Sequence, residues 1–246
     1  MNYAILLSLL NFILLSRLCL VLRDKAVTRK DIFILGGIPL LVFPFLQVNL
    51  VWFLLLFYLL VHPFIYHITE KNETTLNKTR ALVLLLHIVI LGLLCSPVFN
   101  LNVNGLPKEI TGFIDEVMIP ESDVGISDMI NSQIFVFGFL MILNEMNIVL
   151  RYLFRVMGLD ALGKNGEEVD EGEYNTGRLI GMLERIFVFL FVLLGQYTAI
   201  GFILAAKGVA RFQDFKSRTF AEYVLIGTLL SSLLAMAMGY FVKLVL

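Results

Sequence analysis

The 246 residues are 59% hydrophobic and 16% charged, with 19 basic and 20 acidic side chains and a formal net charge of −1. Soluble domains carry about 25% charged residues, so the composition excludes an ordinary water-soluble protein and favours an integral membrane protein. Charge is nearly balanced and no basic block is present, which argues against nucleic acid as a partner and leaves the lipid bilayer as the expected one.

Apolar runs of the length that a membrane-spanning helix needs, about 20 residues, recur along the chain. They predict an all-α fold, a polytopic transmembrane helical bundle of about seven spans. The organisation expected is a four-span region over 1–99, an acidic extramembrane segment over 100–132, and a three-span region over 133–246 with an acidic loop at 158–176. The runs are Met1–Leu22, Ile32–Leu46, Leu50–Ile68, Ala81–Phe99, Gln133–Met157, Ile186–Ala206 and Tyr223–Val242.

Basic residues in short loops set the orientation, because they stay on the cytoplasmic side. The count places the N-terminus outside and the 158–176 loop inside. A single span over Ile186–Ala206 would then put Lys207 and Arg218 outside. The alternative is a re-entrant pair that turns at Gly195-Gln196. The single span is preferred, since each half of the pair has only about ten residues, too few to cross.

Polar residues inside the fifth run form the main candidate site. Asn144, Glu145 and Asn147 lie midway along it, with Arg151 below them. Ionisable groups inside a membrane are costly and mark an ion path, a proton relay or a buried ion pair. With Gln196 from the next run, they predict a polar path between the C-terminal helices. The alternative is an ion pair between Glu145 and an arginine that fixes helix register.

Two further sets of polar residues have simpler interpretations. Glu184 and Arg185 open the sixth run and are expected at the cytoplasmic membrane interface, where Glu184 is expected to pair with a basic residue of a neighbouring helix end. Arg17, in the first run, is expected to extend to the membrane surface as an anchor.

The histidines and cysteines do not form a recognisable metal or redox motif. His62 and His87 lie in antiparallel neighbouring runs and could approach each other, so that with Glu145 they form a conceivable metal set. Their spacing is not a ligand motif, and interface histidines are the preferred interpretation. Cys19 and Cys95 lie in apolar runs and are interpreted as buried small hydrophobes. No metal and no cofactor are therefore expected.

A stripe of small residues marks the last run. Gly227, Ser231, Ala235 and Gly239 recur every fourth position and stack into one groove on a helix. Small residues allow two helices to approach closely in a bilayer. The stripe therefore predicts a packing surface for another helix.

Three motifs mark the last third of the chain: Gly177-Arg178-Leu179-Ile180-Gly181, Leu194-Gly195-Gln196-Tyr197 and Glu222-Tyr223-Val224-Leu225-Ile226-Gly227. Through them, this part of the chain resembles a bacterial membrane family known as domain of unknown function 3307. Members of that family also have a histidine followed four residues later by Asp-Phe in the first span, which this chain lacks. The resemblance implies a multi-pass protein of the bacterial inner membrane, and it implies no activity.

The function expected from these features is movement or sensing of a small solute or ion along the polar path. An enzyme is the less favoured class. One alternative is a membrane scaffold that forms homo-oligomers through the small-residue groove and recruits partners through its acidic loops. A minor alternative is an intramembrane hydrolase that uses Glu145 with His62 or His87.

Overall fold

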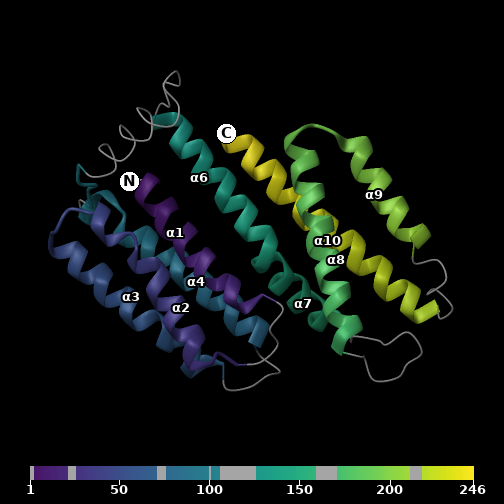
Figure 1. Cartoon of the computed structure of the whole chain (residues 1–246), viewed down its shortest axis with the longest axis horizontal. Coiled ribbons are helices and arrows are strands. Elements are labelled where there is room, and N and C mark those ends of the chain that lie inside the picture. Colours follow the sequence, from purple (N-terminus) through teal and green to yellow (C-terminus); the bar gives the residue numbers. More distant parts are fainter. Residues whose placement is uncertain are drawn as a thin grey trace. The chain divides into compact units, whose positions relative to one another are not determined.

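The structure, a computed structural model, describes residues 3–21, 26–70, 76–99, 101–105, 126–158, 171–210 and 218–246. These residues form helices joined by short turns (Figure 1), so the all-α prediction is confirmed. Most of the acidic segments predicted at 100–132 and 158–176 lies outside the described residues. The helices are α1 (Tyr3–Arg17), α2 (Arg29–Leu40), α3 (Leu50–Thr69), α4 (Leu76–Leu94), α6 (Ile126–Leu140), α7 (Met146–Val156), α8 (Glu171–Leu193), α9 (Tyr197–Ala210) and α10 (Arg218–Val245).

Short helical segments extend several of these helices. The 3-10 turns η1 (Leu18–Leu20), η2 (Phe43–Phe45) and η4 (Pro97–Phe99) follow α1, α2 and α4, and a π-helical segment, η5 (Met141–Glu145), joins α6 to α7. The chain divides into two compact units, an N-terminal unit of Met1–Phe137 and a C-terminal unit of Gly138–Leu246. The boundary between them falls inside α6.

Five stretches of helix in the described part of the chain are long and apolar enough to cross a membrane. Their length and composition fit a membrane-embedded protein. The other two predicted spans correspond to α2 and to the α8–α9 pair, where α2 and α9 are short, with 12 and 14 residues. The five candidate spans are Tyr3–Leu20, Leu50–Thr69, Leu76–Leu94, Met129–Val156 and Ala221–Val245.

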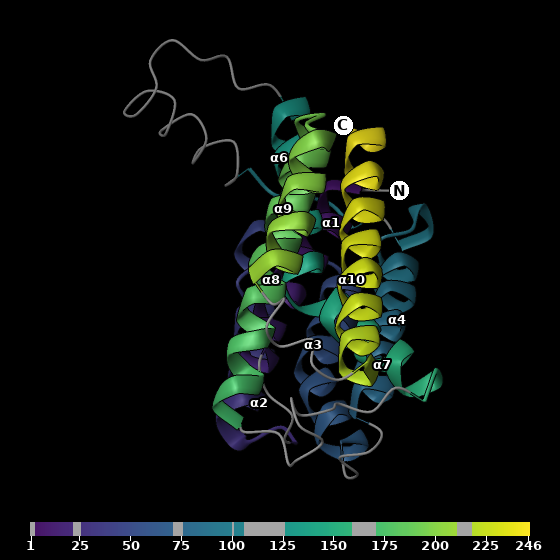
Figure 2. The same ribbon diagram turned by 90° about the vertical axis from the view of Figure 1, so that its right-hand side faces the viewer.

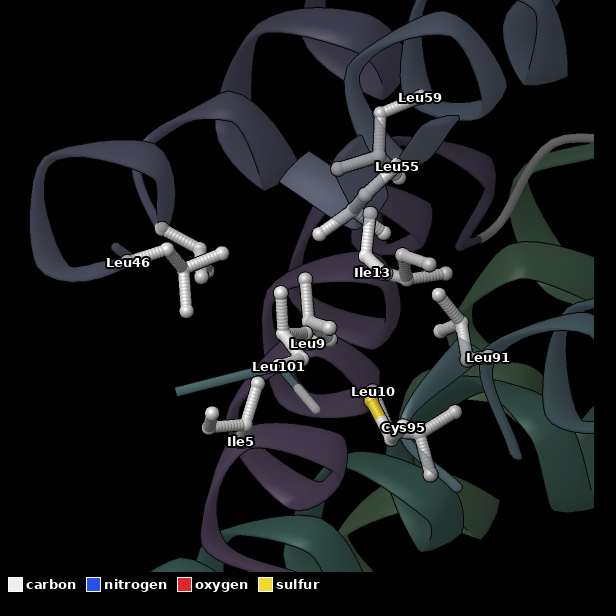
Figure 3. Close-up of a cluster of buried hydrophobic side chains, with 12 residues drawn as sticks. Ile5, Leu9, Leu10, Ile13, Leu46, Leu55, Leu59, Leu91, Cys95 and Leu101 are labelled. Atoms are coloured by element: carbon white, nitrogen blue, oxygen red, sulfur yellow. The ribbon is translucent and has the colours of Figure 1, made fainter. Parts of the chain in front are cut away.

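The core of the N-terminal unit is a set of aliphatic side chains on the facing sides of α1, α3 and α4 (Figure 3). Leu9, Ile13, Leu55, Leu59 and Leu91 are fully buried there. The opposite side of α3 is also apolar but exposed, through Phe53, Phe57, Leu60 and Phe64. A helix that is apolar all round, with one face left open, suits a lipid environment.

The C-terminal unit is built on α8, α9 and α10. Helix α10 packs along α8 (Figure 2), and α9 returns beside α8 in the opposite direction (Figure 1). Val188, Val192, Ile200 and Ala235 form the buried core of this unit. Three helices therefore share one small apolar centre.

The single span predicted over Ile186–Ala206 is wrong, because the helix ends at Leu193 and a new one starts at Tyr197. Gly195 has φ +71, a left-handed conformation that glycine adopts without strain. Its amide donates to the Val192 carbonyl at 3.1 Å, and the Gln196 amide donates to the Phe191 carbonyl at 2.8 Å. This pair of bonds is the Schellman motif, which terminates helices.

An ion pair fixes how far α9 folds back. The Lys207 ammonium on α9 bonds to the Glu184 carboxylate on α8, and both side chains are largely buried. The basic end of α9 therefore lies level with the charged part of α8. This arrangement removes the conflict with the count of basic loop residues, because both basic ends of the hairpin share one side.

Replacing Gly195 by alanine should lower the free energy of unfolding by about 1 kcal/mol, since a side chain disfavours the left-handed conformation. Thermal unfolding in detergent measures the effect. Gly201→Ala in α9 is the matched control, because a Cβ there meets nothing within 4 Å. Equal melting temperatures for the two variants would contradict the role of Gly195.

The hairpin also predicts a labelling pattern. In a chain without Cys19 and Cys95, Thr176→Cys and Ala210→Cys should react with a membrane-impermeant maleimide from the same side of sealed vesicles. Both positions are exposed, and labelling in detergent provides the control for reactivity. Reaction from opposite sides would show that the chain crosses the membrane between them.

Candidate functional site

Both units bury polar and charged side chains, which is costly in an apolar interior unless they are bonded. In the C-terminal unit the buried residues include Asn144, Glu145, Arg185 and Ser231. In the N-terminal unit they include Arg17, Asp31, His62, Glu70, Arg80 and His87. The two clusters are taken separately.

The π-helical segment η5 creates the cluster of the C-terminal unit. Here the Met146 amide donates to the carbonyl of Met141, five residues back, instead of to Ile142, its usual helical partner. The Arg185 side chain takes the place of that donor, with Nε at 3.0 Å from the Ile142 carbonyl oxygen. Arg185 thereby satisfies a backbone carbonyl that the bulge leaves open.

Asn144 and Glu145 end the π segment and are buried, with exposed fractions of 2% and 1%. Asn144 Nδ2 donates to Glu145 Oε1 at 2.9 Å. Asn147 and Arg151 follow on α7 and are partly buried. Gln196 is exposed in the turn between α8 and α9, so the structure does not bring it to the Asn144–Glu145 pair.

Arg185 was expected at the membrane interface and is instead 4% exposed inside the unit. Besides its bond to the Ile142 carbonyl, Arg185 places Nη1 at 3.4 Å from Ser231 Oγ on α10. Its neighbour Glu184 points to α9 and pairs with Lys207. The link between Arg185 and η5 was missed from the sequence, and a buried arginine opposite a polar mid-span segment is the signal that could have suggested it.

Helices of the same unit fill the small-residue groove of α10. A Cβ built on Gly227 would lie 2.9 Å from Phe154 of α7, and one on Gly239 would lie 2.9 Å from Val192 of α8. Ala235 is fully buried. The groove therefore serves packing within the chain.

In the N-terminal unit, the prediction that Arg17 is a surface anchor is wrong. The side chain is fully buried, and its guanidinium donates to the Tyr66 hydroxyl and, at 3.1 Å, to the Arg80 carbonyl oxygen. It also lies over the Tyr66 ring. The partners on α3 and α4 hold Arg17 inside, so it does not extend to the surface.

A hydrogen-bonded chain runs from Arg17 through Tyr66 and His87 to Tyr58. The Tyr66 hydroxyl accepts from Arg17 and lies 3.0 Å from His87 Nε2, and His87 Nδ1 bonds in turn to the Tyr58 hydroxyl. Arginine only donates, which fixes the direction of the first bond, whereas the tautomer of His87 decides the direction of the other two.

His62 and His87 meet as the sequence suggested, with ring centroids 5.2 Å apart. His87 has both nitrogens engaged by tyrosines, so it has none for a metal ion. Within the described residues no three histidine, cysteine, aspartate or glutamate side chains form a metal-binding group. Cys95, just beyond α4, is buried in the apolar core of the unit.

A buried ion pair between Arg80 and Glu70 lies at one end of the N-terminal cluster. Arg80 Nε lies 2.8 Å from Glu70 Oε1, and both side chains are almost fully buried. Glu70 Oε2 also accepts from the Val27 amide at 3.1 Å. Glu70 therefore connects the end of α3 to α4 and to the segment before α2.

No protein-family model, curated protein or solved structure matches the chain. The candidate sites rest on the geometry described above.

Glu70→Gln should destabilise the protein by about 3 kcal/mol, because it leaves the buried Arg80 charge without its partner. The matched control is Glu222→Gln, which removes an exposed pair with Arg218 on α10 and should change stability by less than about 0.5 kcal/mol. Denaturant unfolding in detergent measures both. Similar values for the two variants would contradict a structural role for the Glu70–Arg80 pair.

Proposed function

We propose that this protein is an integral membrane protein that moves or senses a small ion or solute, and that Glu145 is the group that binds it. The observation that carries the proposal is the burial of Glu145 and Asn144 at a π-helical break inside the candidate span Met129–Val156. A carboxylate near the middle of such a span costs a few kcal/mol on insertion. That cost is typical of residues with a function in ion or proton transfer.

The local geometry supports the same conclusion. π-Bulges occur often at functional sites, because the extra residue re-aims side chains. Here the π segment ends in two buried polar residues, and Arg185 bonds to its Ile142 carbonyl. The arrangement places a carboxylate, an amide and a guanidinium within one unit, a set that can bind a small ion.

A structural explanation competes with this proposal. Glu145 could serve to balance the positive charge of Arg185 and to fix the register of α7. The two explanations differ in their consequences. A structural carboxylate affects stability, whereas a functional one affects flux in a protein that is still folded.

The proposed location is a bacterial inner membrane. Its support is the resemblance of the last third of the chain to a bacterial membrane family. The scaffold alternative has no comparable support, because α7 and α8 of the same chain fill the groove that would pair two copies. Transport or sensing is therefore the function put forward.

Reconstitution in liposomes tests the proposal. The liposomes contain a pH-sensitive dye, and a potassium gradient with valinomycin sets their membrane potential. The wild-type protein should then give a proton flux above that of protein-free liposomes. Glu145→Gln keeps the shape of the side chain but removes its charge and its exchangeable proton, and should reduce flux to the protein-free level. Glu222→Gln, on an exposed face of α10, should leave flux unchanged.

The same liposomes separate the outcomes. If the wild-type protein shows no proton flux, the liposomes are loaded in turn with sodium, potassium and chloride, and flux of each ion is measured with the matching indicator. Absence of flux and of any Glu145-dependent binding for all four ions would contradict an ion-coupled function. Flux that persists in folded Glu145→Gln would assign Glu145 to structure.

A further inference from the structure

The C-terminal end of α10 changes from apolar to polar. Tyr240 and Lys243 lie there and are exposed, whereas the stretch 223–239 before them has no charged side chain. Arg218, at the other end of α10, lies about 37 Å from Lys243 along the helix, at about 1.5 Å per residue. The hydrocarbon core of a bilayer is about 30 Å thick. Both charged side chains therefore reach the headgroup layers when α10 spans the membrane.

The turn between α8 and α9 lies beside this end of α10. Lys243 Nζ is 3.8 Å from the position that a Cβ on Gly195 would take, so the ammonium group lies over the turn. The ring of Tyr197, the first residue of α9, stacks on the ring of Tyr240, with centroids 6.0 Å apart and an interplanar angle of 12°. These two contacts bring one ammonium group and two phenol rings together at one level of the C-terminal unit.

The side chains that pack at this end of the unit provide no negative charge. The stretches 186–206 and 223–246 contain neither aspartate nor glutamate. The other two basic residues of α9 and α10, Lys207 and Arg218, lie toward the opposite end and bond to Glu184 and Glu222. The Lys243 ammonium is exposed, so an anion from outside the chain can reach it.

Exposed apolar side chains flank this positive group. They are Leu194 at the end of α8, and Phe241 and Leu244 on α10. Tyrosine is enriched at the membrane interface because its ring is apolar and its hydroxyl is polar, and lysine extends its ammonium toward the headgroups from an apolar stem. An apolar surface next to a cation and two hydroxyls matches a molecule with acyl chains and a negatively charged head.

We propose that Tyr197, Tyr240 and Lys243 form a binding site for the headgroup of an anionic phospholipid. Lys243 supplies the positive charge, and the two tyrosine hydroxyls donate hydrogen bonds to the phosphate oxygens. The acyl chains lie along Leu194 and Phe241. This site goes beyond the proposed function, because it concerns the lipid around the C-terminal unit and involves no transported ion.

A tryptophan beside the site provides a local measure of lipid binding. The chain has one tryptophan, at position 52, so Leu194→Trp in a Trp52→Phe background gives a single indole next to the turn. The protein is reconstituted in mixtures of phosphatidylglycerol and phosphatidylcholine, with bromine on the acyl chains of one lipid at a time. Bromine quenches an indole on contact, so the two quenching curves give the preference for phosphatidylglycerol. A preference of about fivefold is expected from one lysine near the surface.

Substitutions at position 243 test the role of its charge. Lys243→Gln should abolish the preference, and Lys243→Arg should retain it. The matched control is Lys30→Gln, which makes the same change of charge at an exposed position on α2 and should leave the preference unchanged.

The tyrosines and the source of the phosphate are tested in the same vesicles. Tyr197→Phe with Tyr240→Phe keeps both rings but removes both hydroxyls, and should lower the preference without changing quenching by brominated phosphatidylcholine. Inorganic phosphate in the buffer should not displace the lipid, because it cannot contact the apolar flank.

Three outcomes would overturn the proposal. They are equal quenching by the two brominated lipids when Lys243 is intact, a preference that persists in folded Lys243→Gln, and loss of the preference on addition of inorganic phosphate. Circular dichroism of the same samples checks folding. Leu244→Trp replaces Leu194→Trp as the probe if the first probe does not fold.

Discussion

A backbone carbonyl buried in an apolar interior needs a donor, and this requirement explains the placement of several polar side chains. The chain interrupts its helices with Pro39 and Pro63, with the π segment η5, and with the turn at Gly195. Backbone amides bond to the carbonyls at the Gly195 turn, whereas side chains bond to the carbonyls at η5 and at the Pro63 break. Arg185 bonds to the Ile142 carbonyl of η5, and His62 bonds to the Leu59 carbonyl, which lacks an amide donor because of Pro63.

Sequence patterns predicted the features that depend on composition and on spacing along one helix. Long apolar runs located the spans around α1, α3, α4, α6–α7 and α10. The four-residue repeat of small side chains predicted close helix packing on α10, and Phe154 and Val192 contact its glycines. These predictions succeed because the cause and the effect both lie within a single segment.

Features that depend on a partner elsewhere in the chain could not be predicted in this way. Arg17 was assigned to the surface because snorkelling needs only its own helix, whereas its burial needs Tyr66 and Arg80. The π segment leaves the apolar pattern intact, so periodicity does not reveal it. Gly195 is a local signal for a turn, but each half of a helix pair turning there has only about ten apolar residues, too few to cross a membrane. The return of α9 beside α8 depends on the Glu184–Lys207 pair, whose two residues lie far apart in the sequence.

Each unit holds a buried arginine, which only donates hydrogen bonds, against a backbone carbonyl of another helical segment. In the C-terminal unit Arg185 holds η5 in place, which keeps the orientation of Asn144 and Glu145 fixed. In the N-terminal unit Arg17 donates to the Tyr66 hydroxyl, which lies in turn against His87 Nε2. Each arginine therefore joins two helical segments of its own unit, α1 to α4 through the Arg80 carbonyl and α8 to η5 through the Ile142 carbonyl.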